Sequence, residues 1–261
     1  IFYALNHYHW PQNEMDSVLA DQKADQAVFK KMLLPKVRPI MLLILSLFFL
    51  QNLSGIDAIL YYAPTIFENA GFSSYLGALI ATVGLGGVNV LATIIAVYLV
   101  DRLGRRKLFI MGFLLMFLSL IGFSMTEMFL MHSVYAKWVN LIYLIIFIIA
   151  FAISVGPLPF VMMTEVFPTA IRPFCAGLAS SVAWLTNAIV TLLFPTALKF
   201  FGISFLFILF ASVSLVGYLI VLLWLPETMH CTLELIQRNL YNGLPLRWLG
   251  LTSEASILSK D

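Results

Sequence analysis

The sequence predicts an all-α integral membrane protein whose centre is a bundle of six transmembrane helices. Of its 261 residues, 61% are hydrophobic and 11% are charged, whereas a soluble domain carries about 25% charged residues. Six apolar stretches also follow one another, each long enough as a helix to cross a hydrocarbon layer of about 30 Å. They lie near residues 39–62, 75–100, 108–126, 138–163, 174–198 and 203–225.

The composition argues against several classes of function. The net charge of +2 is too small to indicate a nucleic-acid partner. The two cysteines, Cys175 and Cys231, and the four scattered histidines match no metal-binding spacing. A membrane enzyme would need a nucleophile with a base, or a metal cluster, and the sequence contains neither pattern. We therefore expect no nucleic acid, no metal, no cofactor and no catalytic residue.

Residues 1–38 and 226–261 are more polar than the region between them. Residues 16–34 interleave apolar and charged side chains, which predicts a short amphipathic helix outside the hydrocarbon. The chain begins with Ile1, so we expect it to be a piece of a longer protein. The predicted domains are a linker over 1–38, the helical bundle over 39–225 and a tail over 226–261.

The distribution of positive charge predicts the orientation of the bundle. Residues 1–38 hold five Lys or Arg residues, residues 101–107 hold four, and the tail holds three. With Arg172, these make thirteen of the fifteen Lys and Arg residues on one side, against Lys137 and Lys199 on the other. Because positive loops remain in the cytoplasm, both termini are predicted to be cytoplasmic, in a plasma membrane or a bacterial inner membrane.

Polar side chains interrupt the first apolar stretch near its far end, at Gln51, Asn52, Ser54 and Asp57. Inside hydrocarbon such groups are costly unless they face protein or a water-filled cavity. At about 100° per residue, no single face of a straight helix holds Gln51, Asn52 and Asp57. Either neighbouring helices surround this stretch, or it breaks at Ser54-Gly55. The pattern favours a functional cavity over side chains that only join helices.

Three other stretches also contain unusual residues. The fourth carries Pro157 and Pro159, and two prolines require the helix to kink or unwind. The fifth carries Trp184 and Asn187 near its middle, although tryptophan usually lies at the membrane interface. Asn89 in the second stretch fits either a contact between helices or a contact with a ligand.

Four motifs resemble those of the sugar porter family of the major facilitator superfamily. Residues 51–62 resemble the signature of its seventh helix, and residues 101–106 resemble its loop between helices eight and nine. Residues 165–172 resemble the loop after helix ten, and Leu225-Pro226-Glu227-Thr228 resembles the motif after helix twelve. The motifs occur in the family's order and together cover residues 36–236. The chain thus resembles helices seven to twelve, one half of a fold built from inverted repeats of three helices.

The resemblance implies a set of site residues. It places sugar contacts at Gln51, Asn52, Asp57, Asn89, Gly156, Phe160, Trp184 and Asn187. It matches Tyr61 and Tyr62 to an outer gate, and we assign Pro157 and Pro159 to the gate as well. Carboxamides can both donate to and accept from sugar hydroxyls, and aromatic faces cover the apolar side of a sugar ring. The chain departs from the family at Asn52 and Asp57, where Gln and Asn are usual.

The loop charges have two interpretations. They follow the positive-inside rule, and by resemblance they also form a cluster of ion pairs that closes the cytoplasmic side. In the second interpretation Glu165 and Glu227 accept hydrogen bonds from the arginines. The predicted cytoplasmic charge cluster is Asp101, Arg102, Arg105, Arg106, Glu165, Arg172 and Glu227.

These observations predict one half of a transporter that moves a hexose or pentose by alternating access. Uniport and proton symport both remain open, so protons are a second candidate partner beside the sugar. The bundle needs lipid around it and a second six-helix bundle, which is either its own N-terminal half or a copy of itself. Two alternatives are a sugar sensor that does not transport and an inactive, truncated remnant of a transporter.

Overall fold

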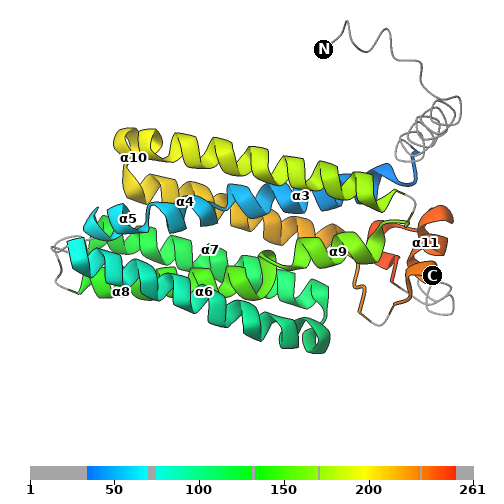
Figure 1. Ribbon diagram of the computed structural model, residues 1–261, viewed down its shortest axis with the longest axis horizontal. Helices are drawn as coiled ribbons and strands as arrows, with labels where there is room; N and C mark the ends of the chain where they lie inside the picture. Colours follow the sequence, from blue (N-terminus) through cyan, green and yellow to red (C-terminus); the bar gives the residue numbers. More distant parts are fainter. Residues whose placement is uncertain are drawn as a thin grey trace, which may run out of the picture.

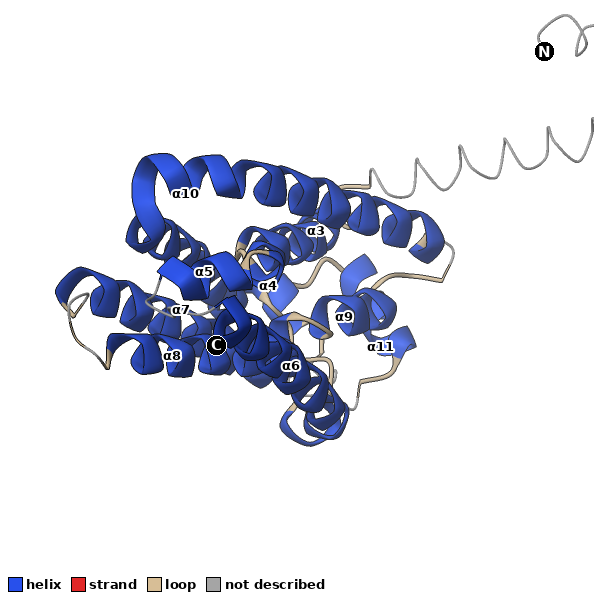
Figure 2. Ribbon diagram, turned by 60° about the vertical axis from the view of Figure 1, so that its left-hand side comes forward, coloured by secondary structure: helices blue, strands red, loops and turns tan. Residues whose placement is uncertain are grey.

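All regular elements in the described residues of the computed structural model are helical (Figure 2). The structure describes residues 34–69, 75–130, 133, 135–169, 171–229 and 231–250. Residues 16–33 of the expected amphipathic helix lie outside these ranges. The elements are α3 (Arg38–Leu53), α4 (Ile56–Tyr61), α5 (Ala63–Asn69), α6 (Tyr75–Leu103), α7 (Arg105–Phe129), α8 (Ala136–Ala150), η1 (Phe151–Val155), α9 (Leu158–Val166), α10 (Arg172–Trp224), α11 (Leu233–Tyr241) and η2 (Leu246–Trp248).

Five helical stretches of the described chain are long and apolar enough to cross a membrane. The last of them, α10, has 53 residues, which as one straight helix would extend about 80 Å, far more than a bilayer core. It does not remain straight, because Gly202 has non-helical torsion angles (φ 77°, ψ 168°). In Figure 1, α10 runs to one end of the bundle, turns there, and runs back alongside its own first half. The six predicted crossings are therefore confirmed, with the last two joined at Gly202.

Two crossings are interrupted: the fourth, where the sequence predicted a kink, and the first, where a break was one of two alternatives. The first divides into α3 and α4 at Ser54-Gly55. The fourth consists of α8, the π-helical turn η1 and the short helix α9, with Pro157 directly before α9. Gly156 N–H donates to the carbonyl oxygen of Phe151 at 2.8 Å, the wider spacing of a π-turn.

Aromatic side chains fill the centre of the bundle around α7. Phe123 of α7 stacks on Phe207 of α10, with 4.0 Å between ring centroids. Phe113, Phe147 and Phe207 are completely buried. Since α7 packs against both α8 and the second half of α10 (Figure 1), it joins the third and fourth crossings to the last.

The outer surface of the bundle is apolar. Ile80 and Val83 of α6 are each 71% exposed, and Leu192 of α10 is 78% exposed. In water such continuous apolar faces would promote association, whereas lipid or a second bundle can cover them. This surface and the length of the helices describe a multi-pass membrane protein.

Candidate functional site

The break in the first crossing depends on Gly55. Its φ of +82° lies in the left-handed region, where a side chain costs roughly 1 kcal/mol or more. A Cβ atom at this position would also lie 2.4 Å from the ring of Phe210. Glycine is therefore required both by the backbone and by the close approach of α10. The break turns α4 so that Asp57 can face the same side as Gln51.

A cavity of about 180 Å³ opens beside this break. Six of the eight predicted sugar contacts line it, together with one predicted gate residue and two small residues of α10. The lining residues are Gln51, Asn52, Asp57, Tyr61, Phe160, Ser180, Ala183, Trp184 and Asn187. The structure thus brings together residues from the first, fourth and fifth crossings that lie up to 136 positions apart in the sequence.

Hydrogen bonds hold the polar groups of the cavity in place. Gln51 Nε2 donates to the carbonyl oxygen of Gly156 at 2.8 Å, which joins α3 to the turn after η1. Asn187 of α10 donates to the carboxylate of Asp57 in α4. Each residue keeps further hydrogen-bonding capacity, because an amide has two donors and two acceptor lone pairs and a carboxylate has about four acceptor sites.

Aromatic rings form the rest of the cavity wall. Phe160 meets Phe48 of α3 edge to face, with centroids 4.8 Å apart. Trp184 and Tyr61 are 72% and 60% exposed. Large aromatic surfaces of this kind next to polar groups suit a ligand that has one apolar and one hydroxyl-bearing face.

Five predicted residues lie away from this cavity or touch it only through the backbone, and one of them, Pro159, is buried in α9. Asn89 is half-buried on α6, and its side chain is not part of the lining. Gly156 contributes its carbonyl oxygen as the acceptor for Gln51. Tyr62 stacks on Phe194 inside the bundle, at 5.2 Å, so only Tyr61 of the predicted tyrosine pair reaches the cavity. Pro157 lines a different cavity, beside Arg105.

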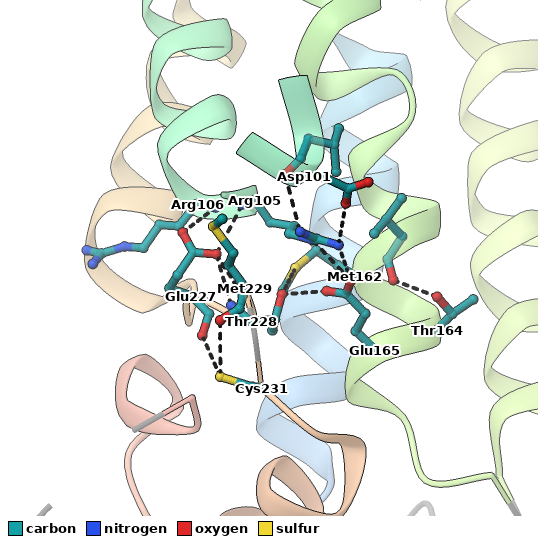
Figure 3. Close-up of polar contacts among 12 residues, drawn as sticks. Asp101, Arg105, Arg106, Met162, Thr164, Glu165, Glu227, Thr228, Met229 and Cys231 are labelled. Atoms are coloured by element: carbon teal, nitrogen blue, oxygen red, sulfur yellow. Dashed lines mark hydrogen bonds and ion pairs between the residues drawn. The ribbon is translucent and has the colours of Figure 1, made fainter. Parts of the chain in front are cut away.

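The predicted charge cluster gathers at one end of the bundle, which we call the charged end (Figure 3). Arg105 at the start of α7 forms an ion pair with Glu165 of α9 at 2.9 Å, and its Nε donates to the same oxygen at 3.0 Å. It also contacts Asp101 at 3.3 Å, but that carboxylate is 76% exposed. Because exposed pairs contribute little, the pair of Arg105 and Glu165 is the stronger connection.

Glu227 accepts hydrogen bonds from two arginines, through their backbone. The N–H groups of Arg105 and Arg106 donate to its two oxygens at 3.0 and 3.2 Å, and those of Thr228 and Met229 donate at 3.1 Å. Glu227 therefore caps the N-terminus of α7, where a carboxylate is favourable. Gly104 permits this approach, since a Cβ there would lie 2.8 Å from the Glu227 carboxylate.

The remaining arginines of the predicted cluster have other positions. Arg172 binds the carbonyl oxygen of Phe167 through Nε and Nη2, at 3.3 and 3.1 Å. Arg106 binds the carbonyl oxygen of Leu222 at 2.9 Å. Arg102 is exposed and forms no ion pair with the described residues. The predicted cluster is thus two adjoining arrangements, an ion pair at Arg105 and a helix cap at Glu227.

Several residues of these sites, and a buried polar pair elsewhere, were absent from the sequence prediction. Ser180 and Ala183 line the cavity and lie one helical turn before Trp184 and Asn187, so helical periodicity from those two could have identified them. Thr228 donates to Glu165 and connects the ion pair to the cap. The buried Glu127 of α7 accepts from Asn140 of α8, away from both sites.

Comparison with known proteins places the chain in a family. The model of the sugar (and other) transporter family matches residues 9–240. The chain belongs to this family. It is 35% identical over 227 residues to the putative metabolite transport protein YwtG of Bacillus subtilis, covering 87% of this chain and 50% of that protein. It is 39% identical over 202 residues to the galactose-proton symporter of Escherichia coli K12, covering 77% and 43% respectively.

Solved structures identify the fold. This sugar transporter family chain matches the inward-open xylose transporter XylE from E. coli with a TM-score of 0.66 and 27% identity, over 83% of this chain and 45% of that one. It matches a D-xylose-proton symporter with a TM-score of 0.69 and 28% identity, over 85% and 51%. The fold is therefore that of one six-helix half of a major facilitator transporter. The chain spans about half the length of these relatives.

Proposed function

We propose that this chain forms one half of a transporter that carries a monosaccharide, a hexose or a pentose, by alternating access. The observation that carries the proposal is the cavity at the break between α3 and α4. There, an amide pair, a carboxylate and exposed aromatic rings converge from three crossings. Amides and a carboxylate match the alternating donors and acceptors of sugar hydroxyls.

The relatives support a sugar as the substrate. The names of two similar proteins refer to galactose and to xylose, and both are called proton symporters. Uniport and proton symport remain alternatives for this chain, because its cavity holds one carboxylate, Asp57, which serves equally as a hydrogen-bond acceptor for a hydroxyl.

The proposal requires a second six-helix bundle. The described cavity is one wall, with Trp184 and Tyr61 mostly exposed, and the chain covers about half of its relatives. A second bundle would cover these rings and leave a central path for the sugar. Pro157 and Pro159 at the break before α9, and Tyr61 at the end of the short helix α4, are proposed as the moving parts that open the path, because interrupted helices can bend at low cost.

The orientation proposed from the positive-inside rule places the charged end in the cytoplasm. In intact cells, a cysteine replacing the exposed Tyr135 should then react with an impermeant maleimide, whereas one replacing the exposed Lys107 should react only after the cells are opened. The reverse labelling pattern would overturn this orientation.

Uptake in proteoliposomes tests the transport proposal. The chain is reconstituted with its second bundle, and uptake of labelled galactose, glucose and xylose is compared with equilibrium binding. Saturable uptake that Asn187→Leu abolishes is the expected result. Binding without uptake would favour a sugar sensor, and absence of both would indicate an inactive remnant.

A further inference from the structure

A second cavity of about 370 Å³ lies at the charged end, and it shares no lining residue with the sugar cavity. It is enclosed by the start of α7, the loop after α10 and the turn η2. Its wall includes Arg106, Glu227, Cys231, Arg247 and Trp248. Its volume lies within the range of about 300–1,000 Å³ that is usual for small-ligand sites.

The cavity holds two guanidinium groups. Figure 3 shows the Arg106 side chain pointing away from the ion pair of Arg105 and Glu165. Its Nη2 is fixed by the carbonyl oxygen of Leu222, while its Nε is buried and has no acceptor among the described residues. Buried donors are nearly always satisfied, so this N–H indicates an acceptor that the described chain does not supply.

The nearby carboxylate does not fill this role. Both oxygens of Glu227 accept backbone N–H groups, and neither accepts a hydrogen bond from the Arg106 side chain. Arg247 forms no ion pair with the described residues, and its positive charge acts on Arg106 more strongly than the negative charge of Glu227 does. Among the described residues, the cavity lining therefore carries two positive charges, on Arg106 and Arg247, against the single negative charge of Glu227.

We propose that this cavity binds a phosphate group, held between Arg106 and Arg247. The planar fork of a guanidinium fits two phosphate oxygens at once, and Arg106 Nε is a donor that such an oxygen would satisfy. This site is separate from the sugar cavity and does not depend on the proposed transport function.

Two kinds of molecule carry a phosphate group that fits this cavity. One is the headgroup of an anionic phospholipid, and the other is a soluble phosphate or phosphate ester. The surroundings of the turn η2 favour the phospholipid. Its residue Leu246 lines an apolar groove of about 310 Å³ with Leu42, Ile220 and Trp224. Adjacent residues of one turn thus face an apolar groove and a cationic cavity, which suits a lipid that has an acyl chain and a phosphate.

Cys231 lies in the cavity wall, so the reactivity of its thiol can report whether the cavity is occupied. In the 261-residue chain with Cys175→Ser, the rate of alkylation of Cys231 by iodoacetamide reports access to the cavity. One arm uses neutral detergent with inorganic phosphate, against chloride at equal ionic strength. The other arm uses phosphatidylcholine nanodiscs with and without phosphatidic acid. The thermal midpoint of the chain is recorded under the same conditions.

Phosphate binding should slow alkylation several-fold and raise the thermal midpoint. Arg247→Gln should weaken the effect roughly tenfold, because it removes a charge-assisted hydrogen-bond donor. Arg238→Gln is the matched control, since Arg238 is also exposed and lies outside the cavity. A response to inorganic phosphate identifies the soluble source, and a response to phosphatidic acid alone identifies the lipid. Absence of any response, or an equal response in Arg247→Gln, would overturn the proposal.

Discussion

Gln51 and Gly156 join the two interrupted crossings, because Nε2 of Gln51 donates to the carbonyl oxygen of Gly156 at 2.8 Å. Gln51 lies one turn before the break at Gly55, and Gly156 lies between η1 and α9. Pro157 and Pro159 provide no N–H, so carbonyl groups around this turn need other donors. The hydrogen bond therefore links a candidate sugar contact to the backbone of a candidate gate.

Gln51→Leu should weaken sugar binding and loosen the turn at Gly156. A hydrogen bond of this kind contributes about 0.5–1.5 kcal/mol, which predicts a loss of affinity of roughly two- to thirteenfold from the lost protein contact alone. Sugar binding to the reconstituted transporter checks the loss, and hydrogen exchange of the amides at 156–161 checks the turn. Ser46→Ala is the control, because Ser46 is on the same helix and bonds only within it, to Leu43. Unchanged exchange at 156–161 in Gln51→Leu would contradict the link.

Asp57 and Asn187 should behave as a coupled pair. Asn187→Asp places two carboxylates where one now accepts from an amide, so like charges repel and sugar affinity should fall more than tenfold. The exchanged variant Asp57→Asn with Asn187→Asp restores one amide and one carboxylate, and it should recover most of the affinity. A double-mutant cycle on sugar binding measures the coupling energy. Additive losses would mean that the two side chains act independently.

Arg105→Ala should open the charged end. The pair of Arg105 and Glu165 is mostly buried, with exposed side-chain fractions of 14% and 24%. Losing one partner of such a pair costs more than losing an exposed one. With both native cysteines replaced by serine and Ser180→Cys added in the sugar cavity, labelling from the charged end should increase several-fold. Arg102→Ala is the control, since Arg102 is exposed and unpaired among the described residues. Equal labelling in both variants would mean that these charges only set the orientation of the chain in the membrane and do not close the charged end.

The sequence indicated where the helices of the site are interrupted better than it indicated which side chains meet there. Ser54-Gly55 and the two prolines identified both breaks, because glycine and proline act on their own backbone. The pairing of Asp57 with Asn187 across 130 positions could not be read from the sequence, since local pattern carries no information about which helices adjoin.

The charge cluster illustrates the same limit. The loops provided its candidate residues, with Glu165 and Glu227 as acceptors for the arginines, and in the structure Glu165 pairs with Arg105. That Glu227 accepts backbone N–H groups of two arginines depends on how closely the chain after α10 approaches Gly104. The π-turn η1 was also beyond the sequence signal, which indicated a kink without specifying its form.

Gly55→Ala should destabilise the bundle through two separate effects. The left-handed torsion costs roughly 1–2 kcal/mol for alanine, and the new Cβ would meet the ring of Phe210 at 2.4 Å. Gly243→Ala isolates the first effect, because Gly243 has a similar φ of 78° and open space around it. The thermal midpoint in detergent should fall clearly further for Gly55→Ala than for Gly243→Ala. Equal shifts would show that Phe210 moves aside freely.

The thiol of Cys231 lies at the charged end, outside the membrane crossings. Burial raises the pKa of Cys231, and the nearby carboxylates of Glu227 and then Glu165 raise it further. The thiolate is the reactive form, so at neutral pH alkylation should be slower than for a free thiol in solution. As pH increases, the rate should reach half its maximum above the ordinary pKa of a cysteine. Since a neutral side chain no longer opposes the thiolate, Glu165→Gln should move this midpoint downward.

Glu234→Gln is the control, because Glu234 is exposed on α11 and is not among the groups that act on Cys231. The pH profile of iodoacetamide labelling in the Cys175→Ser background gives the answer. A midpoint at the ordinary cysteine pKa would mean that solvent reaches Cys231 freely.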